Sequence, residues 1–373
     1  MNKKKIIFVF GTRPEAIKLA PLISEFKKNE NFLTLSVSTG QHKEMLQQVT
    51  SFFNINIDYS LDIMTKNQSL NHLSAKILIS LKEVFEKENP DYVFVHGDTS
   101  TTAFGAIAAF YNKSKICHVE AGLRTFNKFS PFPEEINRTI TGRLADFHFA
   151  PTQTAKQNLL NEGIPEKSIE ITGNTVIDAL MMSVKLTEKK EDIEIKKLKK
   201  IISKNKKTIL VTGHRRENIG KGFENICSAL REIANNKDVE IVYPVHLNPK
   251  VKDVVHSMLG NISNIHLIDP LSYPAFTWIM NQSYLILTDS GGVQEEAPSL
   301  GVPVLVLRDT TERPEGIKAN TAILVGTEKV RIIDTVNLLL DQKTFYNKVS
   351  QSKNPYGLGD ASKKIVTFME KNG

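Results

Sequence analysis

Four side chains in this sequence have the types and positions that proton transfer requires. Asp98, Glu120 and His214 each come shortly after a short apolar run, and Glu134 follows a segment stiffened by two prolines. Carboxylates and imidazoles can take a proton from a substrate and return it, with an efficiency that depends on their pKa values. These residues therefore indicate acid–base chemistry.

Each of these side chains also has a structural explanation. Asp98 could cap the helix expected to follow it, although Thr99 could cap that helix instead. Glu134 would be favoured at a helix N-terminus by the helix dipole. No capping role suits Glu120, and packing does not explain why His214 stands beside two arginines at the end of a strand. The structural explanation stays open for Asp98 and Glu134, and chemistry is favoured for Glu120 and His214.

A glycine-bearing turn after another apolar run is typical of a nucleotide site. Gly291 and Gly292 would let a ligand approach the backbone, and the N-terminus of the following helix would favour a phosphate. Glu296 would repel a phosphate, so it suits the hydroxyl groups of a ribose better. Arg13, expected at the mouth of the first helix, also suits a phosphate. The alternative is an ordinary strand-to-helix turn capped by Asp289 or Ser290.

The elements that must position these residues are short strands alternating with longer helices. Helical patterns such as 69–86 and 222–234 separate most of the strands, which favours parallel sheets covered by helices. Such sheets bind ligands beyond the carboxyl ends of their strands, where the candidate residues lie. The alternation occurs in two blocks, separated by a lysine-rich segment, 185–207, which we expect to be a solvated helix and linker. The expected strands are 6–10, 33–38, 92–95, 116–119, 147–150, 169–172, 208–212, 240–244, 264–268, 284–287, 304–307 and 322–325.

Composition excludes several classes of protein. A chain of 373 residues suits two domains, and no apolar stretch is long enough to span a bilayer, so we expect a cytoplasmic protein. The net charge of +7 comes without interleaved aromatic residues, so it does not predict nucleic-acid binding. Cys117 and Cys227 belong to no CxxC pair, which argues against a disulfide framework or a zinc site. No Walker, GxGxxG, HExxH or GxSxG motif occurs.

A series of short motifs runs nearly from end to end of the chain. Together they resemble the non-hydrolysing UDP-N-acetylglucosamine 2-epimerases. The motifs are 11–15 (GTRPE), 40–42 (GQH), 96–99 (HGDT), 119–124 (VEAGLR), 133–135 (PEE), 213–217 (GHRRE), 289–292 (DSGG), 295–298 (EEAP) and 308–315 (RDTTERPE).

The resemblance implies a glycosyltransferase-B architecture, in which two Rossmann-like α/β domains face each other across a cleft. The expected domains are 1–172, with the catalytic carboxylates, and 173–355, which binds UDP; a C-terminal helix, 356–373, returns to the first domain. The resemblance also implies a homodimer that needs no metal and no nicotinamide, with UDP-N-acetylglucosamine and UDP as ligands and no nucleic-acid or membrane partner. The family's product, UDP-N-acetylmannosamine, supplies cell-surface polysaccharides.

Chemistry favours one route for such a reaction. Carbon 2 of the sugar has no adjacent carbonyl, so removal of its proton alone would leave an unstabilised carbanion. Loss of UDP from carbon 1 together with that proton avoids this and leaves 2-acetamidoglucal. Return of UDP, and of a proton to the opposite face, gives the epimer. The scheme needs acid–base groups near both faces of carbon 2 and cationic groups on the diphosphate.

The resemblance assigns residues to these tasks. Catalytic roles fall to Asp98, Glu120, Glu134 and His214, and substrate binding to Arg13, Ser290, Gly291, Gly292, Glu296 and Arg313. Some bacterial members bind a second UDP-N-acetylglucosamine as an activator, for which the resemblance suggests Gln41, Glu135, Arg215 and His246. The segment 66–68 lacks the arginine that activator-dependent members carry, which argues against such activation here.

Other functions remain open at this point. A hydrolysing relative would release UDP and free N-acetylmannosamine, and an assay of free UDP distinguishes it. A glycosyltransferase of the same fold would depend on an acceptor, and a nucleotide-sugar sensor would bind without turnover. A related sugar, such as a 2,3-diacetamido uronic acid, could also be the substrate.

Overall fold

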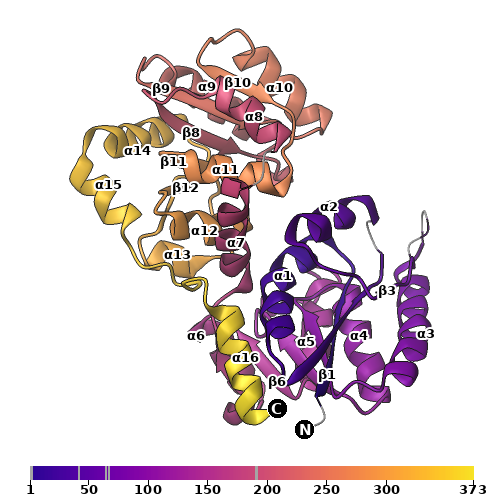
Figure 1. Ribbon diagram of the computed structural model, residues 1–373. Helices are drawn as coiled ribbons and strands as arrows, with labels where there is room; N and C mark the ends of the chain where they lie inside the picture. Colours follow the sequence, from indigo (N-terminus) through magenta and orange to yellow (C-terminus); the bar gives the residue numbers. More distant parts are fainter. Residues whose placement is uncertain (1–2, 41–42, 64, 66–67, 190–191) are drawn as a thin grey trace. The chain divides into compact units, whose positions relative to one another are not determined.

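In a computed structural model, the chain folds into two compact units (Figure 1). The structure describes residues 3–40, 43–63, 65, 68–189 and 192–373. The first unit comprises Met1–Met181 and Tyr356–Gly373, and the second comprises Met182–Pro355. Both are parallel α/β structures, as the alternation of apolar runs and helical patterns predicts.

The first unit is built on a parallel sheet of seven strands in the order β3-β2-β1-β4-β5-β6-β7. The order reverses between β1 and β4, which pair in parallel through residues such as Phe8 and Phe94. The strands are β1 (Lys4–Phe10), β2 (Phe32–Ser38), β3 (Tyr59–Ser60), β4 (Tyr92–His96), β5 (Lys115–Val119), β6 (Phe147–Ala150) and β7 (Ile169–Ile171). The helices are α1 (Arg13–Lys28), α2 (Lys43–Phe53), α3 (Leu70–Glu88), α4 (Ser100–Tyr111), α5 (Glu134–Leu144), α6 (Gln153–Asn161), η1 (Glu166–Ser168), α7 (Thr175–Lys189) and α16 (Ala361–Asn372).

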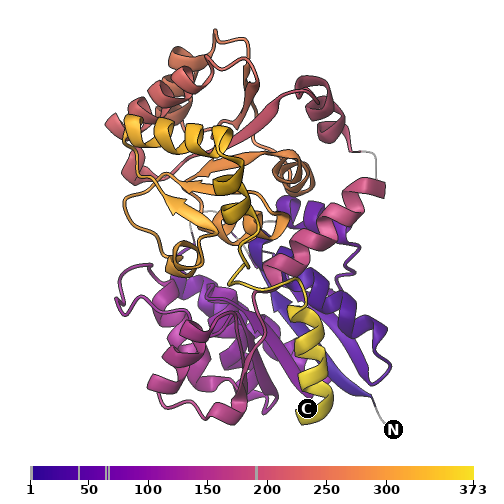
Figure 2. The ribbon, with the colours of Figure 1, turned by 90° about the vertical axis from the view of Figure 1, so that its left-hand side faces the viewer.

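Aromatic side chains hold the centre of this sheet to its helices. Phe8 stacks on Phe94 with ring centroids 4.8 Å apart, and Phe94 stacks on Phe149 at 6.1 Å. Phe368 of the C-terminal helix α16 meets Phe149 edge-on. This helix packs beside α1, as both views show (Figures 1 and 2). The last residues of the chain are therefore part of the first unit's core.

The first unit continues beyond residue 172, where the sequence suggested that the first domain ends. Val176 and Ile177 of α7 form a buried cluster with Tyr356. The carboxylate of Asp178 accepts the backbone N–H groups of Ala361 and Ser362, at 3.2 and 2.8 Å, at the start of α16. The chain passes into the second unit inside α7, between Met181 and Met182.

The second unit has a parallel sheet of six strands in the order β10-β9-β8-β11-β12-β13. The order again reverses beside the first strand of the unit, here between β8 and β11. The strands are β8 (Lys207–Thr212), β9 (Val239–Pro244), β10 (Ile265–Ile268), β11 (Leu285–Thr288), β12 (Val304–Val306) and β13 (Ala322–Leu324). The helices are α8 (Ile193–Ile201), η2 (Arg216–Asn218), α9 (Lys221–Ile233), α10 (Pro249–Leu259), α11 (Tyr273–Gln282), α12 (Gly291–Glu296), η3 (Ala297–Leu300), α13 (Pro314–Lys318), α14 (Lys329–Asp341) and α15 (Lys343–Ser350).

The lysine-rich segment 185–207 contains the expected helix, but this helix packs on the second unit and is not part of a linker. Its helix α8 buries Ile195 and Leu198, three residues apart, and packs against α11. The carboxylate of Glu194 accepts the N–H and hydroxyl of Ser272 at the start of α11. The lysines cover only the outer face of an amphipathic helix, which explains why the composition of this segment resembles that of a linker.

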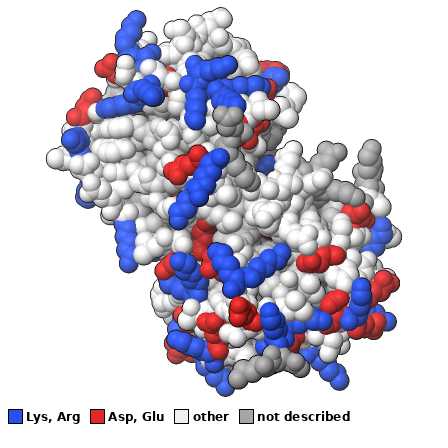
Figure 3. All heavy atoms as spheres, in the orientation of Figure 1, with Lys and Arg blue, Asp and Glu red and all other residues white. Residues whose placement is uncertain are grey.

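All the expected strands are present, with ends that shift by no more than two residues, and among the described residues only the two-residue strand β3 was not predicted. None of the helices in the described part of the chain is long and apolar enough to cross a membrane. On the face in Figure 3, acidic and basic side chains intermix over the first unit. That distribution differs from the continuous basic surface of a nucleic-acid-binding protein.

A buried histidine makes stability depend on pH. Burial lowers the pKa of His118, on β5, to about 3, and its Nε2 lies 2.8 Å from the carbonyl oxygen of Gly97. The unfolded chain binds that proton near pH 6.5. The free energy of unfolding should therefore fall as pH drops below 6.5, by up to about 1.4 kcal/mol per pH unit from this side chain. Urea unfolding between pH 7 and 5 should show a shallower dependence in His118→Gln, and equal slopes would contradict this account.

Candidate active site

The first group of candidate residues lies where β1 and β4 end side by side at the reversal of strand order. The buried carboxylate of Glu15 joins the loops that follow these strands. It accepts the N–H groups of Gly11 and Thr12, at 3.1 and 2.7 Å, and the hydroxyl of Thr99 at 2.7 Å. Thr99 also caps α4. Asp98 is therefore not needed as the cap of α4 and is available for other interactions.

Asp98 is half-buried and paired with an arginine of α5. Its Oδ2 accepts a hydrogen bond from Arg138 Nη2 at 2.5 Å, and its backbone carbonyl accepts one from Asn137 at 3.0 Å. Burial raises the pKa of Asp98, and the negative charge of Glu120 adds to this; the charges of Arg138 and Lys18 oppose it. The raised pKa suits a carboxyl group that both takes and gives a proton.

Glu120 has the opposite environment. Its carboxylate forms an ion pair with Lys18 of α1, and His96 Nε2 lies 3.0 Å from its Oε2. Although burial favours the neutral acid, Lys18 and His96 hold the pKa of Glu120 well below its usual range. Glu120 also has a φ of +62°, a left-handed conformation that costs energy in a residue other than glycine. Such an outlier next to a proton-transfer candidate supports a functional role.

The pKa values of the two carboxyl groups are therefore shifted in opposite directions although the groups lie near each other. Asp98 has a raised pKa, whereas Glu120 is kept anionic by its cationic neighbours. Two carboxyl groups whose environments push their pKa values apart are the usual arrangement for an acid–base pair. This pair is the strongest sign of chemistry in the first unit.

The structure places the other two predicted residues of the first unit at helix starts near this pair. Glu134 opens α5 and lies one turn before Arg138, so both are on one side of that helix. Arg13 opens α1, one residue after Thr12, whose side chain caps the helix. Both side chains are half-buried.

In the second unit, the buried carboxylate of Asp289 organises the predicted histidine. It follows β11, and its Oδ2 accepts the N–H groups of His214 and Arg215 at 2.9 and 2.8 Å. The His214 ring stacks on that of His246, with centroids 5.4 Å apart. Partial burial lowers the pKa of His214, and the charges of His246 and Arg215 add to this effect, whereas the charge of Asp289 opposes it. His214 is therefore a neutral hydrogen-bonding group at neutral pH.

The glycine-bearing turn also lies in the second unit. A Cβ atom on Gly291 would meet no atom of the described residues within 4 Å, and this glycine has no positive φ. Neither backbone conformation nor packing explains the glycine, so the free space suits a ligand. Glu296 is buried, and its Oε1 accepts a hydrogen bond from the hydroxyl of Tyr273 at 3.2 Å. Its other carboxylate oxygen faces Gly292, 3.7 Å from the position of a Cβ there. Ser290 precedes these glycines as the N-cap residue of α12.

The remaining predicted residues are Arg313 and the four residues suggested for an activator. Arg313 donates through Nε to the buried carboxylate of Glu295, and its backbone N–H binds the hydroxyl of Thr311. Among the residues suggested for an activator, Glu135 belongs to the first unit and has a buried carboxylate, whereas Arg215 and His246 belong to the second. Gln41 lies outside the described residues, as do positions 66 and 67 of the segment used to argue against activation.

Sequence reasoning missed three residues that the structure brings to the carboxyl pair: Lys18, His96 and Arg138. A lysine inside an amphipathic helix is normally taken as solvated, and Lys18 gives no local sign of its ion pair. Arg138 stands one helical turn after Glu134 and so shares its face of α5. That spacing is the one signal that could have identified it.

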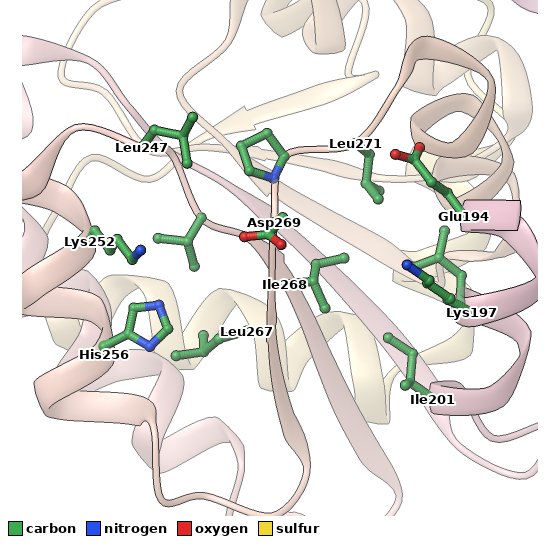
Figure 4. Close-up of a pocket in the computed structure, with 13 residues that line it drawn as sticks. Glu194, Lys197, Ile201, Leu247, Lys252, His256, Leu267, Ile268, Asp269 and Leu271 are labelled. Atoms are coloured by element: carbon green, nitrogen blue, oxygen red, sulfur yellow. The ribbon is translucent and has the colours of Figure 1, made fainter.

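A separate pocket of about 460 Å³ in the second unit contains none of the predicted residues (Figure 4). Its floor is apolar, with Leu267 and Ile268 at the end of β10. Lys252 and His256 stand on one side and Glu194 and Lys197 on the other. These charged groups do not converge on one point, so the candidate site remains at the ends of the strands.

Comparison with known proteins identifies the family of this chain. Residues 24–370 match the family model described as UDP-N-acetylglucosamine 2-epimerase. The chain belongs to this family. The UDP-N-acetylglucosamine 2-epimerase of Escherichia coli K12 is 51% identical over 371 residues, which cover 99% of each chain.

Solved epimerase structures share the fold. The Neisseria meningitidis UDP-GlcNAc 2-epimerase, bound to UDP-GlcNAc (UDP-N-acetylglucosamine), has a TM-score of 0.87 and 49% identity over 99% of this chain and 100% of that one. The Methanocaldococcus jannaschii UDP-GlcNAc 2-epimerase, in complex with UDP-GlcNAc and UDP, has a TM-score of 0.78 and 36% identity over 99% of this chain and 100% of that one. Both units of the present chain therefore have the architecture of the 2-epimerases.

Proposed function

We propose that this protein converts UDP-N-acetylglucosamine and UDP-N-acetylmannosamine into each other without hydrolysis. The observation that carries the proposal is the pair of neighbouring carboxyl groups, Asp98 and Glu120, whose surroundings shift their pKa values in opposite directions. Membership of the 2-epimerase family, and relatives that bind UDP-GlcNAc and UDP, indicate the substrate. The family's role suggests that the product is used for cell-surface polysaccharide.

The chemistry proceeds by elimination and addition. A base removes the proton from carbon 2, the C–H electron pair becomes the C1–C2 double bond of 2-acetamidoglucal, and the C1–O bond to UDP breaks. UDP then adds back to carbon 1 as a proton is delivered to the opposite face of carbon 2. Asp98 is the candidate for one proton transfer because its pKa is raised. Glu134, on the same face of α5 as the arginine that binds Asp98, is the candidate for the other.

The remaining groups interact with the sugar ring and the diphosphate, where charge develops during the reaction. Glu120 and Lys18 form an ion pair whose negative end stays ionised, so it can stabilise positive charge that develops on the sugar ring. His214 is neutral, which suits a hydrogen bond to the diphosphate rather than a countercharge. Arg13 and Arg313 supply the positive charge that favours departure of UDP.

UDP is held by the second unit in this proposal. The open space at Gly291 receives the diphosphate, with Gly292 and Ser290 at the same turn. Glu296 binds ribose hydroxyls, because Tyr273 orients the carboxylate from inside the unit. Calorimetric titration with UDP, and with an analogue that lacks the ribose hydroxyls, measures how much these hydroxyls contribute to the affinity for UDP.

A homodimer is the expected assembly, and the α3–α4 face of the first unit is suited to it. Ile79, Phe110 and Tyr111 are large apolar side chains that are 64%, 57% and 73% exposed. They lie beside Lys82 and Glu86, a pair of opposite charges. A face that combines apolar groups with both signs of charge can pair with a copy of itself about a two-fold axis.

Tyr111→Glu should therefore weaken the dimer, because it buries a charge in the apolar centre of this face. Light scattering over a range of concentrations should give a dimer mass for the wild-type protein and a mass nearer the monomer for the variant. Arg143→Glu, on α5, is a control at another exposed position of the same unit. A wild-type monomer, or a Tyr111→Glu dimer as tight as the wild type, would count against this face.

Proton NMR of UDP-N-acetylglucosamine with the pure protein in heavy water tests the reaction. We expect signals of UDP-N-acetylmannosamine, deuterium at carbon 2 of both sugars, and no continuing accumulation of free UDP. Steady release of UDP with free N-acetylmannosamine would identify a hydrolysing enzyme instead. Epimer that keeps hydrogen at carbon 2 would exclude the proton-exchange scheme.

Asp98→Asn should retain the fold and lose about 100-fold or more in turnover, as expected for removal of a general acid–base group. Circular dichroism and UDP titration serve as controls for folding and for nucleotide binding. Turnover within a few-fold of the wild type would remove Asp98 from the mechanism.

A further inference from the structure

Glu135, the residue after the proposed catalytic Glu134, has a buried carboxylate that binds backbone and arginine at once. Both of its oxygens lie 3.1 Å from the N–H of Thr125, and Oε1 accepts the N–H of Phe126 at 2.9 Å. Its Oε2 also lies 3.3 Å from Arg138 Nη1. The side chain is 5% exposed, so these interactions are shielded from water.

Arg138 stands between two carboxylates. Its Nη2 donates to Asp98 at 2.5 Å, and its Nη1 faces Glu135. Its buried Nε has no hydrogen-bond partner among the described residues. The positive charge of the guanidinium is therefore shared between Asp98 and Glu135, and whatever binds Glu135 changes how strongly Arg138 acts on Asp98.

Glu135 also fixes the β5–α5 loop (residues 120–133). Two consecutive backbone N–H groups point at one carboxylate there, which is an anion-binding arrangement of the main chain. Phe126 has a φ of +61°, a conformation that a phenylalanine adopts only when its surroundings hold it. The hydroxyl of Thr125 closes the loop by donating to the carbonyl of Ser130 at 2.6 Å.

We propose that Glu135 is a positioning residue that controls the proton affinity of Asp98 through Arg138, and that the same carboxylate anchors the loop beside it. This inference rests on the role proposed above for Asp98. Glu135 does not touch the reacting atoms in this view. Its negative charge partly neutralises Arg138, which leaves Asp98 able to hold a proton.

The charged groups that face Asp98 are Arg138 from α5, Glu120 from the end of β5 and Lys18 from α1. Removal of the Glu135 charge leaves the latter two unchanged and leaves Arg138 with one carboxylate partner instead of two. Arg138 then stabilises the Asp98 carboxylate more strongly, and the pKa of Asp98 falls.

The test compares Glu135→Gln with Glu135→Asp. The glutamine keeps the size of the side chain and removes the charge, whereas the aspartate keeps the charge on a shorter stem. Carbon-13 NMR titration of the Asp98 carboxyl carbon, identified by its absence in Asp98→Asn, should show a pKa lowered by at least about 0.5 unit in Glu135→Gln. Glu135→Asp should stay near the wild-type value. The limb of the kcat/KM profile that Asp98→Asn abolishes should move in the same direction.

Glu162→Gln provides a matched control. It removes the charge of another arginine partner in the same unit, since Glu162 binds Arg124 through two contacts of 2.6 and 2.8 Å. This variant should leave the Asp98 titration unchanged. An unchanged Asp98 pKa in Glu135→Gln, or equal shifts in the glutamine and aspartate variants or in Glu162→Gln, would overturn the proposal.

The NMR titration needs no turnover and therefore separates this inference from the proposed function. A wild-type protein that forms no epimer but shows the Asp98 shift in Glu135→Gln contradicts the function and supports the positioning role. If the wild-type protein epimerises but the Asp98 titration is unchanged in Glu135→Gln, the result supports the function and contradicts the positioning role.

Discussion

In each unit, the position of the candidate residues depends on a reversal of strand order in the sheet. In the first unit the order turns between β1 and β4, and in the second between β8 and β11. Helices that follow neighbouring strands at such a point leave in opposite directions, so the loops between them separate and leave room for a ligand. Arg13 and Asp98 stand at one reversal, and His214 and Asp289 at the other. The candidate residues therefore lie at two places that the topology leaves open, one in each unit.

Buried carboxylates hold the loops at these places. Glu15, Glu135 and Asp289 each accept two backbone N–H groups. Each also meets one more side chain: Thr99, Arg138 and Asn218, respectively. A carboxylate that accepts several hydrogen bonds from the main chain is stable without water, and its removal leaves buried donors unpaired. Acidic side chains in this protein thus serve two purposes, and burial with backbone contacts distinguishes the anchors from the groups free to meet a substrate.

The electrostatic difference between Asp98 and Glu120 comes from their neighbours. Both are carboxyl groups at the ends of adjacent strands, but one faces an arginine shared with Glu135 and the other faces a lysine and a histidine. A cation that is shared between two carboxylates lowers the pKa of each one less than a cation that pairs with a single carboxylate. The pKa values of two similar side chains are therefore shifted in opposite directions, which suits a reversible proton transfer.

The sequence by itself determined the α/β class, nearly every strand and the family, because buried parallel strands appear as apolar runs and the motifs at their ends keep a fixed order. It also indicated that Thr99 could release Asp98 from capping. It did not reveal that α8 is part of the second unit, since the lysines of that helix hide its two buried residues. Only the tertiary structure showed that Lys18 and His96 meet Glu120, and that Glu135 turns inward to the backbone and Arg138. Those contacts join residues far apart in the chain, and the pKa of a buried group depends on such neighbours rather than on its place in a motif.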